Sequence, residues 1–353
     1  MSLFYKKFIR PLFFNLDAES AHELVCRNLA RLEKSCLAKR LICNTLSSGN
    51  SPVDLFGLSF PNHLGLAAGL DKDGRFPGIS SALGFGHIEV GTVTPKPQPG
   101  NDKPRLFRYP KDEALINRMG FNNDGAKKLC ERLKATYPKG KRSSPLGVNI
   151  GKGKETPIDE ASSDYNSAFD SVAEQADYIT VNVSSPNTPE LRKLQDKDHL
   201  ESLLKAICTR RNYWCKINQS KALPLLLKLS PDESFSSIER IIGAARDLGF
   251  DGVIATNTSI GRDNLSDPGT HEAGGLSGKP IEKRSIEVIR FISNLTNSRF
   301  PIIGAGGIHD TDSAIRKLDA GASLLQIYTS FIYEGPLFPS TLAKSLSHRK
   351  SFF

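Results

Sequence analysis

Residues 301–310, Pro-Ile-Ile-Gly-Ala-Gly-Gly-Ile-His-Asp, decide the fold, because they join a short apolar run to a glycine-rich turn that leads into a helical pattern. Seven further apolar runs of this kind occur along the chain. With 301–304 they make eight candidate strands, the others lying at 62–66, 87–90, 146–150, 178–183, 225–229, 252–255 and 324–327. Most of them do not alternate polar and apolar residues, which indicates parallel strands covered by helices. Eight strand–helix units predict an α/β fold of the (β/α)8 TIM barrel type rather than a doubly wound sheet.

One connection, 91–145, is too long for a simple link between a strand and a helix. It contains two short β-like runs, 106–108 and 114–116. We expect them to form an additional hairpin over the mouth of the barrel, since the ends of parallel strands in this fold are covered by their loops.

The N-terminal segment has a different pattern. Apolar residues recur there at helical spacing, at Phe4, Tyr5, Phe8, Ile9 and Leu12. Basic residues share another face, at Lys6, Lys7 and Arg10. We expect Pro11 to end or kink this helix and Asp17 to cap a second one. The sequence therefore predicts a small N-terminal α-helical domain at 1–44 and a barrel domain at 45–353.

The composition limits the class of protein. The 353 residues include 47 Lys and Arg against 38 Asp and Glu, a net charge of +9. Such a chain either meets phosphates or anionic lipid or has a generally basic surface, and the charge alone leaves both readings open. No helix-turn-helix, zinc-finger or RNA-reading pattern occurs, so we expect no nucleic acid partner.

Cysteine spacing and apolar run length exclude further classes. The six cysteines form no C-x-x-C pair, which argues against a zinc site and a disulfide framework. No apolar run reaches the length of a transmembrane helix, and the N-terminus lacks a secretory pattern. We expect no bound metal and a protein that faces the cytoplasm.

Small or polar residues follow each predicted strand, where TIM barrels build their active sites. After the last two strands, Gly304-Ala305-Gly306-Gly307 and Tyr328–Thr329 predict a phosphate site, the alternative being a tight turn without a ligand. Lys228 lies within the apolar run 225–229. It is either an outward-facing lysine or a buried cation beside a group that becomes anionic during turnover, such as reduced flavin.

Several residues suit a polar ring ligand. The amides suit alternating C=O and N–H groups, as in a pyrimidine, and they are Asn117, Asn122, Asn182, Asn187 and Asn257. Lys72 either binds a substrate carboxylate or is a solvated loop lysine. The serines that follow the fourth strand, Ser184 and Ser185, are either turn residues or members of a proton relay.

Taken together, the motifs closely resemble those of the dihydroorotate dehydrogenases. The resemblance covers nearly the whole chain in order. Its motifs are Leu64-Gly65-Leu66-Ala67-Ala68-Gly69-Leu70-Asp71-Lys72-Asp73, Gly91-Thr92-Val93-Thr94-Pro95, Asn117-Arg118-Met119-Gly120-Phe121-Asn122, Asn182-Val183-Ser184-Ser185-Pro186-Asn187-Thr188-Pro189, Ala255-Thr256-Asn257-Thr258, Gly274-Gly275-Leu276-Ser277-Gly278 and Ile303-Gly304-Ala305-Gly306-Gly307-Ile308.

The resemblance implies oxidation of (S)-dihydroorotate to orotate with bound FMN, in de novo pyrimidine (UMP) synthesis. The C5 proton would leave to a base while a hydride passes from C6 to flavin N5. Soluble members of the family use a cysteine as this base and quinone-dependent members a serine. This chain has Ser185 there, which favours the quinone-dependent class.

The resemblance also implies the ligand-binding residues. Those for the substrate are Lys72, Asn117, Arg118, Met119, Gly120, Phe121, Asn182, Asn187, Asn257 and Thr258. Those for the flavin ring and ribityl chain are Ala68, Gly69, Leu70, Asp71, Lys72, Thr92, Asn149, Asn182, Lys228, Thr256 and Gly278, and those for its phosphate are Gly306, Gly307, Tyr328 and Thr329. In this reading Lys228 stabilises the reduced, anionic flavin.

On the electron-exit side, the resemblance implies ubiquinone or menaquinone as acceptor, with His22, Arg108 and Tyr328 beside it. The N-terminal helices would form an apolar tunnel on the cytoplasmic face of the inner membrane. Phe4, Phe8, Leu12 and Phe13 would enter the interface, and Lys6, Lys7 and Arg10 would face anionic headgroups. We expect a peripheral, monomeric protein without an obligate protein partner. The alternatives are a related FMN barrel with a soluble acceptor and a non-catalytic phosphate-binding or membrane-surface barrel.

Overall fold

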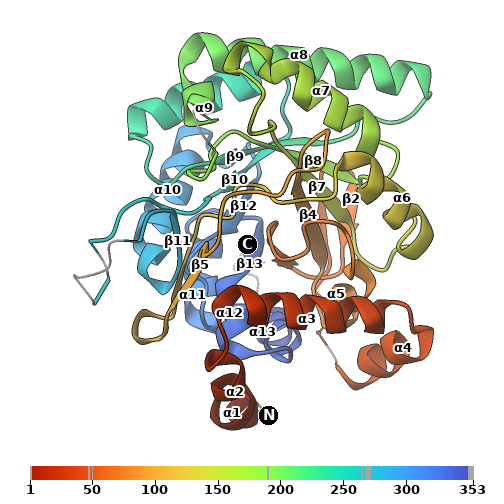
Figure 1. The fold of residues 1–353 in the computed structure, drawn as a ribbon. Helices are drawn as coiled ribbons and strands as arrows, with labels where there is room; N and C mark the ends of the chain where they lie inside the picture. Colours follow the sequence, from red (N-terminus) through yellow and green to blue (C-terminus); the bar gives the residue numbers. More distant parts are fainter. Residues whose placement is uncertain are drawn as a thin grey trace.

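Eight parallel strands close into a barrel in the computed structural model, which describes residues 2–46, 48–49, 51–188, 191–263, 265–266 and 272–348 (Figure 1). In chain order the strands are β3 (Leu64–Leu66), β4 (His87–Val93), β7 (Leu146–Ile150), β8 (Tyr178–Asn182), β9 (Leu225–Leu229), β10 (Gly252–Ala255), β12 (Ile302–Ala305) and β13 (Leu324–Ile327). Neighbours in the chain are neighbours in the barrel, and β13 pairs with β3 to close it. The predicted (β/α)8 architecture is confirmed.

Strand ends differ from the predicted ones by a few residues, for local reasons. β3 begins at Leu64 because the Asn62 side chain accepts a hydrogen bond from the Leu64 N–H at 2.9 Å and forms a turn there. β4 continues to Val93, with an irregularity in its register against β7 between Gly91 and Val93. β12 begins after Pro301, which has no N–H to give to the sheet.

Helices form the outer layer of the barrel (Figure 1). They are α5 (Pro77–Ala82), α6 (Ala126–Thr136), α7 (Ala161–Val172), α8 (Lys197–Ile217), α9 (Phe235–Asp247), α10 (Glu282–Leu295), α11 (Thr311–Asp319), α12 (Thr329–Glu334) and α13 (Phe338–Ser347). Asp310 caps α11, since its side chain accepts a hydrogen bond from Ser313 N at 2.7 Å.

Two small sheets flank the barrel. The predicted hairpin over the mouth is present as β5 (Leu106–Tyr109) and β6 (Ala114–Asn117), and β11 (Gly275–Gly278) adds a third antiparallel strand. The hairpin of β1 (Val53–Leu55) and β2 (Leu58–Phe60) was not predicted, although its alternating apolar residues and Phe56-Gly57 turn are a recognisable signal. Phe60 packs with the apolar residues inside the barrel.

Helices also make up the N-terminal segment: α1 (Ser2–Phe4), a π-helical turn η1 (Tyr5–Ile9), α2 (Arg10–Phe14), α3 (Ala18–Glu33) and α4 (Cys36–Thr45). Asp17 caps α3 as predicted, accepting hydrogen bonds from Glu19 N and Ser20 N. Pro11 does not end the first helix, because it lies in the first turn of α2, where a missing N–H is tolerated. None of the described helices is long and apolar enough to span a membrane.

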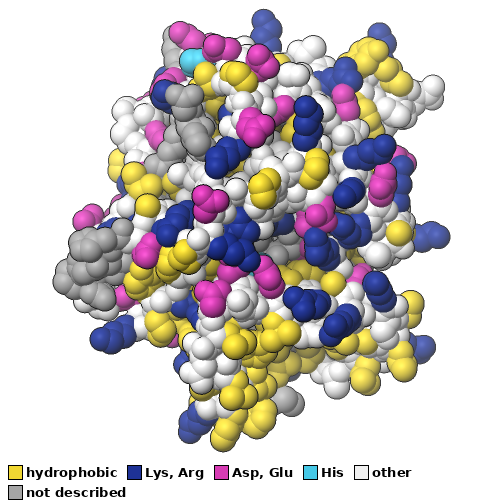
Figure 2. Space-filling view, viewed as in Figure 1, with side chains coloured by type: hydrophobic (Ala, Val, Ile, Leu, Met, Phe, Trp, Pro, Cys, Tyr) yellow, Lys and Arg dark blue, Asp and Glu magenta, His cyan; other side chains and the backbone are white. Residues whose placement is uncertain are grey.

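The predicted orientation of the basic residues is wrong for two of the three. Lys6 pairs with Glu334 at 2.6 Å, and Arg10 donates a hydrogen bond to the Tyr333 carbonyl at 3.1 Å. Both therefore contact the C-terminal end of α12, whose free carbonyls favour cations. Lys7 is exposed. Apolar side chains are exposed around it, and Figure 2 shows them gathered where α1 and α2 lie.

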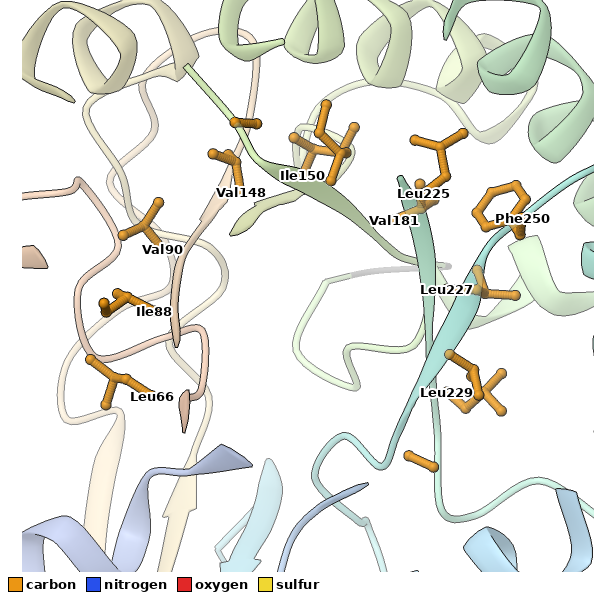
Figure 3. Close-up of a cluster of buried hydrophobic side chains, with 14 of the residues drawn as sticks. Leu66, Ile88, Val90, Val148, Ile150, Val181, Leu225, Leu227, Leu229 and Phe250 are labelled. Carbon is orange, nitrogen blue, oxygen red and sulfur yellow. The ribbon is translucent and has the colours of Figure 1, made fainter. Parts of the chain in front are cut away.

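Alternation along the strands separates two layers of the core. Leu225, Leu227 and Leu229 of β9 project to the same side of the strand and join the cluster that packs against the helices (Figure 3). Leu226 belongs to a second cluster inside the barrel, with Tyr178 and other inward-facing residues. Because side chains alternate with a period of two, Lys228 also faces the barrel interior.

His87 lies inside the barrel at the N-terminal end of β4. It is fully buried, and its ring lies edge-on to Phe60 with the centroids 5.5 Å apart. Neither ring nitrogen has a hydrogen-bond partner within the described residues. Burial lowers the pKa of His87 to about 3, so the folded protein holds a neutral imidazole at every pH above that value.

We predict that His87 makes the protein sensitive to mild acid. Below pH ~6.5 the unfolded chain binds a proton at this residue that the folded chain does not, so stability falls on the order of 1 kcal/mol per pH unit. Urea unfolding at pH 7 and pH 5 should show a larger loss for the wild type than for His87→Leu. Equal losses in the two proteins would contradict the prediction.

Candidate active site

A cavity opens at the C-terminal ends of the barrel strands and encloses about 1110 Å³ of empty space, including its mouth. We call it the central cavity. Most of the predicted site residues line it: Ala68, Gly69, Lys72, Thr92, Asn117, Met119, Gly120, Phe121, Asn182, Ser185, Asn187, Lys228, Thr256, Asn257, Thr258, Gly278, Gly306, Gly307, Tyr328 and Thr329. Leu106 of β5 and Leu115 of β6 also line it, so the antiparallel sheet contributes to its wall.

A buried carboxylate lies below the central cavity. Glu89 of β4 is fully buried, and its Oε1 lies 3.6 Å from Lys228 Nζ and accepts a hydrogen bond from Asn149 Nδ2 at 2.8 Å. Its Oε2 accepts hydrogen bonds from Gln326 Nε2 at 2.9 Å and Thr180 Oγ1 at 3.1 Å. Polar groups from four strands besides β4 therefore converge on the Glu89 carboxylate. Of the two alternatives for Lys228, the structure supports the buried cation, which is paired and faces the barrel interior.

Amide and hydroxyl groups extend this hydrogen-bond network from Glu89 to the residues that line the central cavity. Thr92 Oγ1 donates to Asn149 Oδ1 at 2.5 Å and accepts from Asn182 Nδ2 at 3.0 Å. Asn257 Nδ2 donates to Ser184 Oγ at 3.0 Å and lies 3.3 Å from Asn182 Oδ1. Hydrogen bonds within the protein therefore orient the side-chain amides of Asn149, Asn182 and Asn257.

The loop after β8 carries two serines with different surroundings. Ser184 is fully buried and its hydroxyl donates to the Lys228 carbonyl at 2.7 Å. Ser185 lines the central cavity, and its Oγ accepts a hydrogen bond from Asn187 N at 3.3 Å. Asn187 Nδ2 in turn donates to Asn117 Oδ1 at 3.1 Å. Ser185 is thus the serine that a ligand can reach. Pro189, the last residue of this predicted motif, lies outside the described residues.

Lys72 reaches the same part of the cavity from the loop after β3. Its Nζ donates to Asn122 Oδ1 at 2.7 Å. Burial lowers the pKa of Lys72 to about 8, and the positive charge of Arg105 acts in the same direction. The ammonium therefore remains largely protonated at neutral pH and is poorly compensated by its surroundings. An anionic ligand would stabilise it.

Several buried polar atoms of the lining have no hydrogen-bond partner within the described residues. They are Asn187 Oδ1, Thr256 Oγ1, Gln326 Oε1 and Ser330 Oγ. Buried polar groups are nearly always satisfied by protein, water or a ligand. Their concentration in one cavity therefore indicates a polar ligand or ordered water there.

The glycine-rich turn after β12 has no room for side chains. Gly306 and Gly307 both have positive φ, +95° and +77°. A Cβ on Gly307 would lie 2.3 Å from the Glu282 Cα, so only glycine fits at this position. Backbone N–H groups of such a turn can approach an anion closely, which is the local requirement of the predicted phosphate site.

Four of the residues predicted to bind the substrate or the flavin do not line the central cavity, and neither does Asn122 of the predicted amide set. Asn149 lies behind Thr92, and Leu70 lies in the loop after β3. Asp71 accepts hydrogen bonds from Arg75 N and Phe76 N, and burial raises its pKa to about 6. Arg118 pairs with Glu272 at 2.5 Å and stacks on the Phe107 ring.

The three residues predicted for the quinone side lie toward the N-terminal helices. Tyr328 lines the cavity, and burial raises its pKa above the ordinary value. His22 of α3 lies 3.6 Å from the Cys26 Sγ; burial and the charge of Lys72 lower its pKa to about 4, so its ring is neutral at pH 7. Arg108 donates to the Phe13 carbonyl at 2.9 Å and lies over the Phe14 ring.

Two polar residues of the barrel interior were missed from the sequence. Glu89 and Gln326 lie in apolar runs, as Lys228 does, and each is buried. The argument that a charged residue within a buried strand needs a partner applies equally to Glu89. It would have indicated the pair with Lys228. Within the described residues, no group of His, Cys, Asp or Glu side chains could hold a metal ion.

Comparisons with known proteins agree on one family. The sequence profile described as Dihydroorotate dehydrogenase matches residues 51–349. A protein of Chloroflexus aurantiacus named dihydroorotate dehydrogenase (quinone) is 48% identical, the match covering 99% of this chain and 98% of that protein. A protein of Delftia acidovorans with the same name is 44% identical over 98% of this chain and 99% of its own length. The crystal structure of DHODH in complex with ferulenol from Eimeria tenella superposes with a TM-score of 0.82 at 36% identity, covering 94% of this chain and 90% of that one.

We predict that Glu89→Gln destabilises the protein by roughly 3–5 kcal/mol, because it leaves Lys228 as a buried cation without its carboxylate. Thr180→Val is the matched control, since it removes one donor to Glu89 and keeps the charge pair. Its loss should be clearly smaller. The shift of the urea unfolding midpoint measures both. Equal shifts would mean that the Glu89–Lys228 pair contributes no more than an ordinary hydrogen bond.

Proposed function

The chain belongs to the dihydroorotate dehydrogenase family, and from this premise we propose that it oxidises (S)-dihydroorotate to orotate with bound FMN and passes the electrons to a membrane quinone. The reaction belongs to de novo pyrimidine (UMP) synthesis. The observation that carries the proposal is the composition of one cavity. A cation, a set of amides and a reachable serine lie at one part of its wall, and a buried charge pair and a glycine turn lie at others.

The substrate part of the cavity suits a pyrimidine with a carboxylate. The Lys72 ammonium supplies the charge for the carboxylate, and its lowered pKa means that an anion beside it is favourable. Amide groups supply both donors and acceptors for the ring, from Asn117, Asn182, Asn187 and Asn257, with Thr258 beside them. Met119, Gly120 and Phe121 complete this wall, and Arg118, which points away, holds the segment through its contact with Glu272.

Two observations support the fit between the residues present and FMN. Buried oxygens of Thr256, Gln326 and Ser330 line the cavity, and they have no hydrogen-bond partner within the part of the chain that the structure describes. The turn Gly306–Gly307 leaves its backbone free of side chains. FMN, when bound, supplies the hydride acceptor for C6 of dihydroorotate and the route of the electrons to the quinone.

The chain's own residues would hold and tune this group. The phosphate would bind at Gly306, Gly307, Tyr328 and Thr329, and the ring and ribityl chain at Ala68, Gly69, Thr92, Asn182, Lys228, Thr256 and Gly278. Lys228, fixed by Glu89, supplies a positive charge in a site of low dielectric, which favours negative charge beside it. Asn149 would act by orienting Thr92, and Leu70 and Asp71 by shaping the loop that carries Lys72.

Ser185 is proposed as the acceptor of the C5 proton. It is the serine of its loop that lines the cavity, and the hydrogen bond from Asn187 N orients its Oγ. A serine needs an outlet for its own proton to act in this way. Thr188 of the same loop offers a buried hydroxyl for such a relay.

We propose the quinone side and the membrane contact from the N-terminal helices, with residues 1–44 as a separate helical domain and 45–353 as the catalytic barrel. Four side chains of α1, η1 and α2 are 59–69% exposed although apolar: Leu3, Phe4, Phe8 and Leu12. Such a surface favours insertion into a lipid interface. Ubiquinone or menaquinone would enter between these helices, toward His22, Arg108 and Tyr328. We propose a monomer on the cytoplasmic face of the inner membrane.

Substituting Ser185 tests the function. Ser185→Ala should bind FMN and orotate as the wild type does, yet dihydroorotate should reduce its flavin ~100- to 10,000-fold more slowly, because the general base is lost. Anaerobic stopped-flow measurement of the flavin absorbance gives this rate. Flavin reduction at nearly the wild-type rate would remove Ser185 from the proton transfer.

Orotate binding should weaken as the pH rises through the pKa of Lys72. The ammonium is the protonated, charged form, so its contribution is present below pH 8 and is lost above it. From pH 7 to pH 9 the charged fraction falls from about 90% to about 10%, and the orotate Kd should rise about tenfold. Lys72→Ala should bind weakly at pH 7 with a Kd that changes little with pH. A wild-type Kd independent of pH would assign Lys72 to the solvated-loop alternative.

A further inference from the structure

We infer that Glu19, on the N-terminal helix α3, is a positioning residue for the oxidation of dihydroorotate, an inference that rests on the function proposed above. Glu19 holds Arg105, and Arg105 holds the turn 99–101. Asn101 of this turn ties the Ser185 loop to the strand end that carries Asn117. The N-terminal helices would then serve substrate oxidation as well as electron exit.

The first link is a buried ion pair between the helical segment and the barrel. Arg105 Nη2 donates to Glu19 Oε1 at 2.9 Å, and its Nε donates to the same oxygen at 3.1 Å. Glu19 is 4% exposed and Arg105 7% exposed. Burial opposes the ionised form of Glu19. The hydrogen bonds and charges of Arg105 and Lys103 outweigh it and keep the pKa of the carboxyl below its ordinary value.

The second link wraps a turn around the guanidinium. Arg105 Nη1 donates to the carbonyls of Pro99 and Asn101, both at 2.7 Å. Gly100 between them has a φ of +81°, and a Cβ there would lie 2.8 Å from Arg105 Nη1 and 2.3 Å from the Met119 carbonyl. The turn 99–101 is therefore shaped on the Arg105 side chain, and its position depends on where Glu19 holds that side chain.

The third link reaches the substrate residues. Asn101 Nδ2 donates to the carbonyl of Asn187 at 3.0 Å and to that of Arg118 at 2.9 Å. Asn187 contacts both Asn117 and Ser185. One side-chain amide thus bridges the loop with the proposed base and the strand end with the proposed substrate amides.

Loss of the Glu19 charge would release this chain of contacts. A buried guanidinium without its carboxylate is unfavourable. We therefore expect Arg105 to turn toward water and to lose its hydrogen bonds to the carbonyls of Pro99 and Asn101. A displacement of about 1 Å between substrate and base can slow a reaction ~100-fold. We therefore expect at least a tenfold effect on orotate binding or on flavin reduction.

Glu19→Gln in the full-length, FMN-loaded protein tests the inference, with Glu23→Gln as the matched control. Glu23 lies one turn further along α3 and pairs with Lys103 at 2.9 Å, but it is exposed and does not contact Arg105. Four quantities are measured: flavin content, the orotate Kd by titration calorimetry, the rate of flavin reduction by dihydroorotate, and the rate of flavin reoxidation by a short-tailed ubiquinone analogue.

We expect Glu19→Gln to keep its flavin and its reoxidation rate, while the orotate Kd rises or flavin reduction slows by tenfold or more. Glu23→Gln should match the wild type in all four. A Glu19→Gln protein with a lower melting temperature but wild-type orotate Kd and reduction rate would reduce Glu19 to a structural role and overturn the inference.

Asn101→Ala keeps the inference testable if Glu19→Gln does not fold. It removes the hydrogen bonds from Asn101 to the carbonyls of Asn187 and Arg118, and it leaves the buried ion pair intact. It should show the same loss of orotate affinity or of reduction rate, and wild-type values would overturn the inference. If the wild-type protein bound no orotate and dihydroorotate did not reduce its flavin, the proposed function itself would be refuted.

Discussion

The buried pair of Glu89 and Lys228 is the interaction around which the active site is arranged. Two opposite charges inside a barrel are tolerated only when they are paired and hydrogen-bonded, and Asn149, Thr180 and Gln326 supply those bonds from three further strands. The register of β4, β7, β8, β9 and β13 must bring these five side chains together near the level of the charge pair. Above that level the same strands end in the amides, hydroxyls and glycines that line the central cavity.

The N-terminal helices are joined to this arrangement by polar contacts rather than by apolar packing alone. Arg105 ties α3 to the turn at 99–101, and Lys6 and Arg10 tie the first helices to the end of α12. The apolar side chains of α1 and α2 that remain exposed do not take part in these contacts, and we propose that they contact the membrane. The same polar contacts therefore support both proposed sites. Electrons would enter at the substrate site and leave through the quinone tunnel.

Much of this structure could be predicted from the sequence, because strands, turns and caps are local signals. Apolar runs predicted all eight barrel strands, and Asp17 marked the start of α3. Lys228 can be recognised from the sequence because it interrupts an apolar strand, and the same signal is present at Glu89 and Gln326. The directions of Lys6 and Arg10 could not be predicted, since their partners on α12 are more than 300 residues away in the chain. A contact with a distant segment also decides that Arg118 points out of the cavity, because its partner is Glu272.

Turnover with quinone tests the central claim most directly. The purified yellow protein would be given dihydroorotate, with a short-tailed ubiquinone analogue as the only acceptor, and orotate formation would be followed by its absorbance. We expect steady orotate formation that requires the quinone. No orotate with quinone, but orotate with fumarate or a nicotinamide cofactor, would keep the barrel chemistry and contradict the role given to the N-terminal helices. No orotate with any acceptor would contradict the proposed function itself.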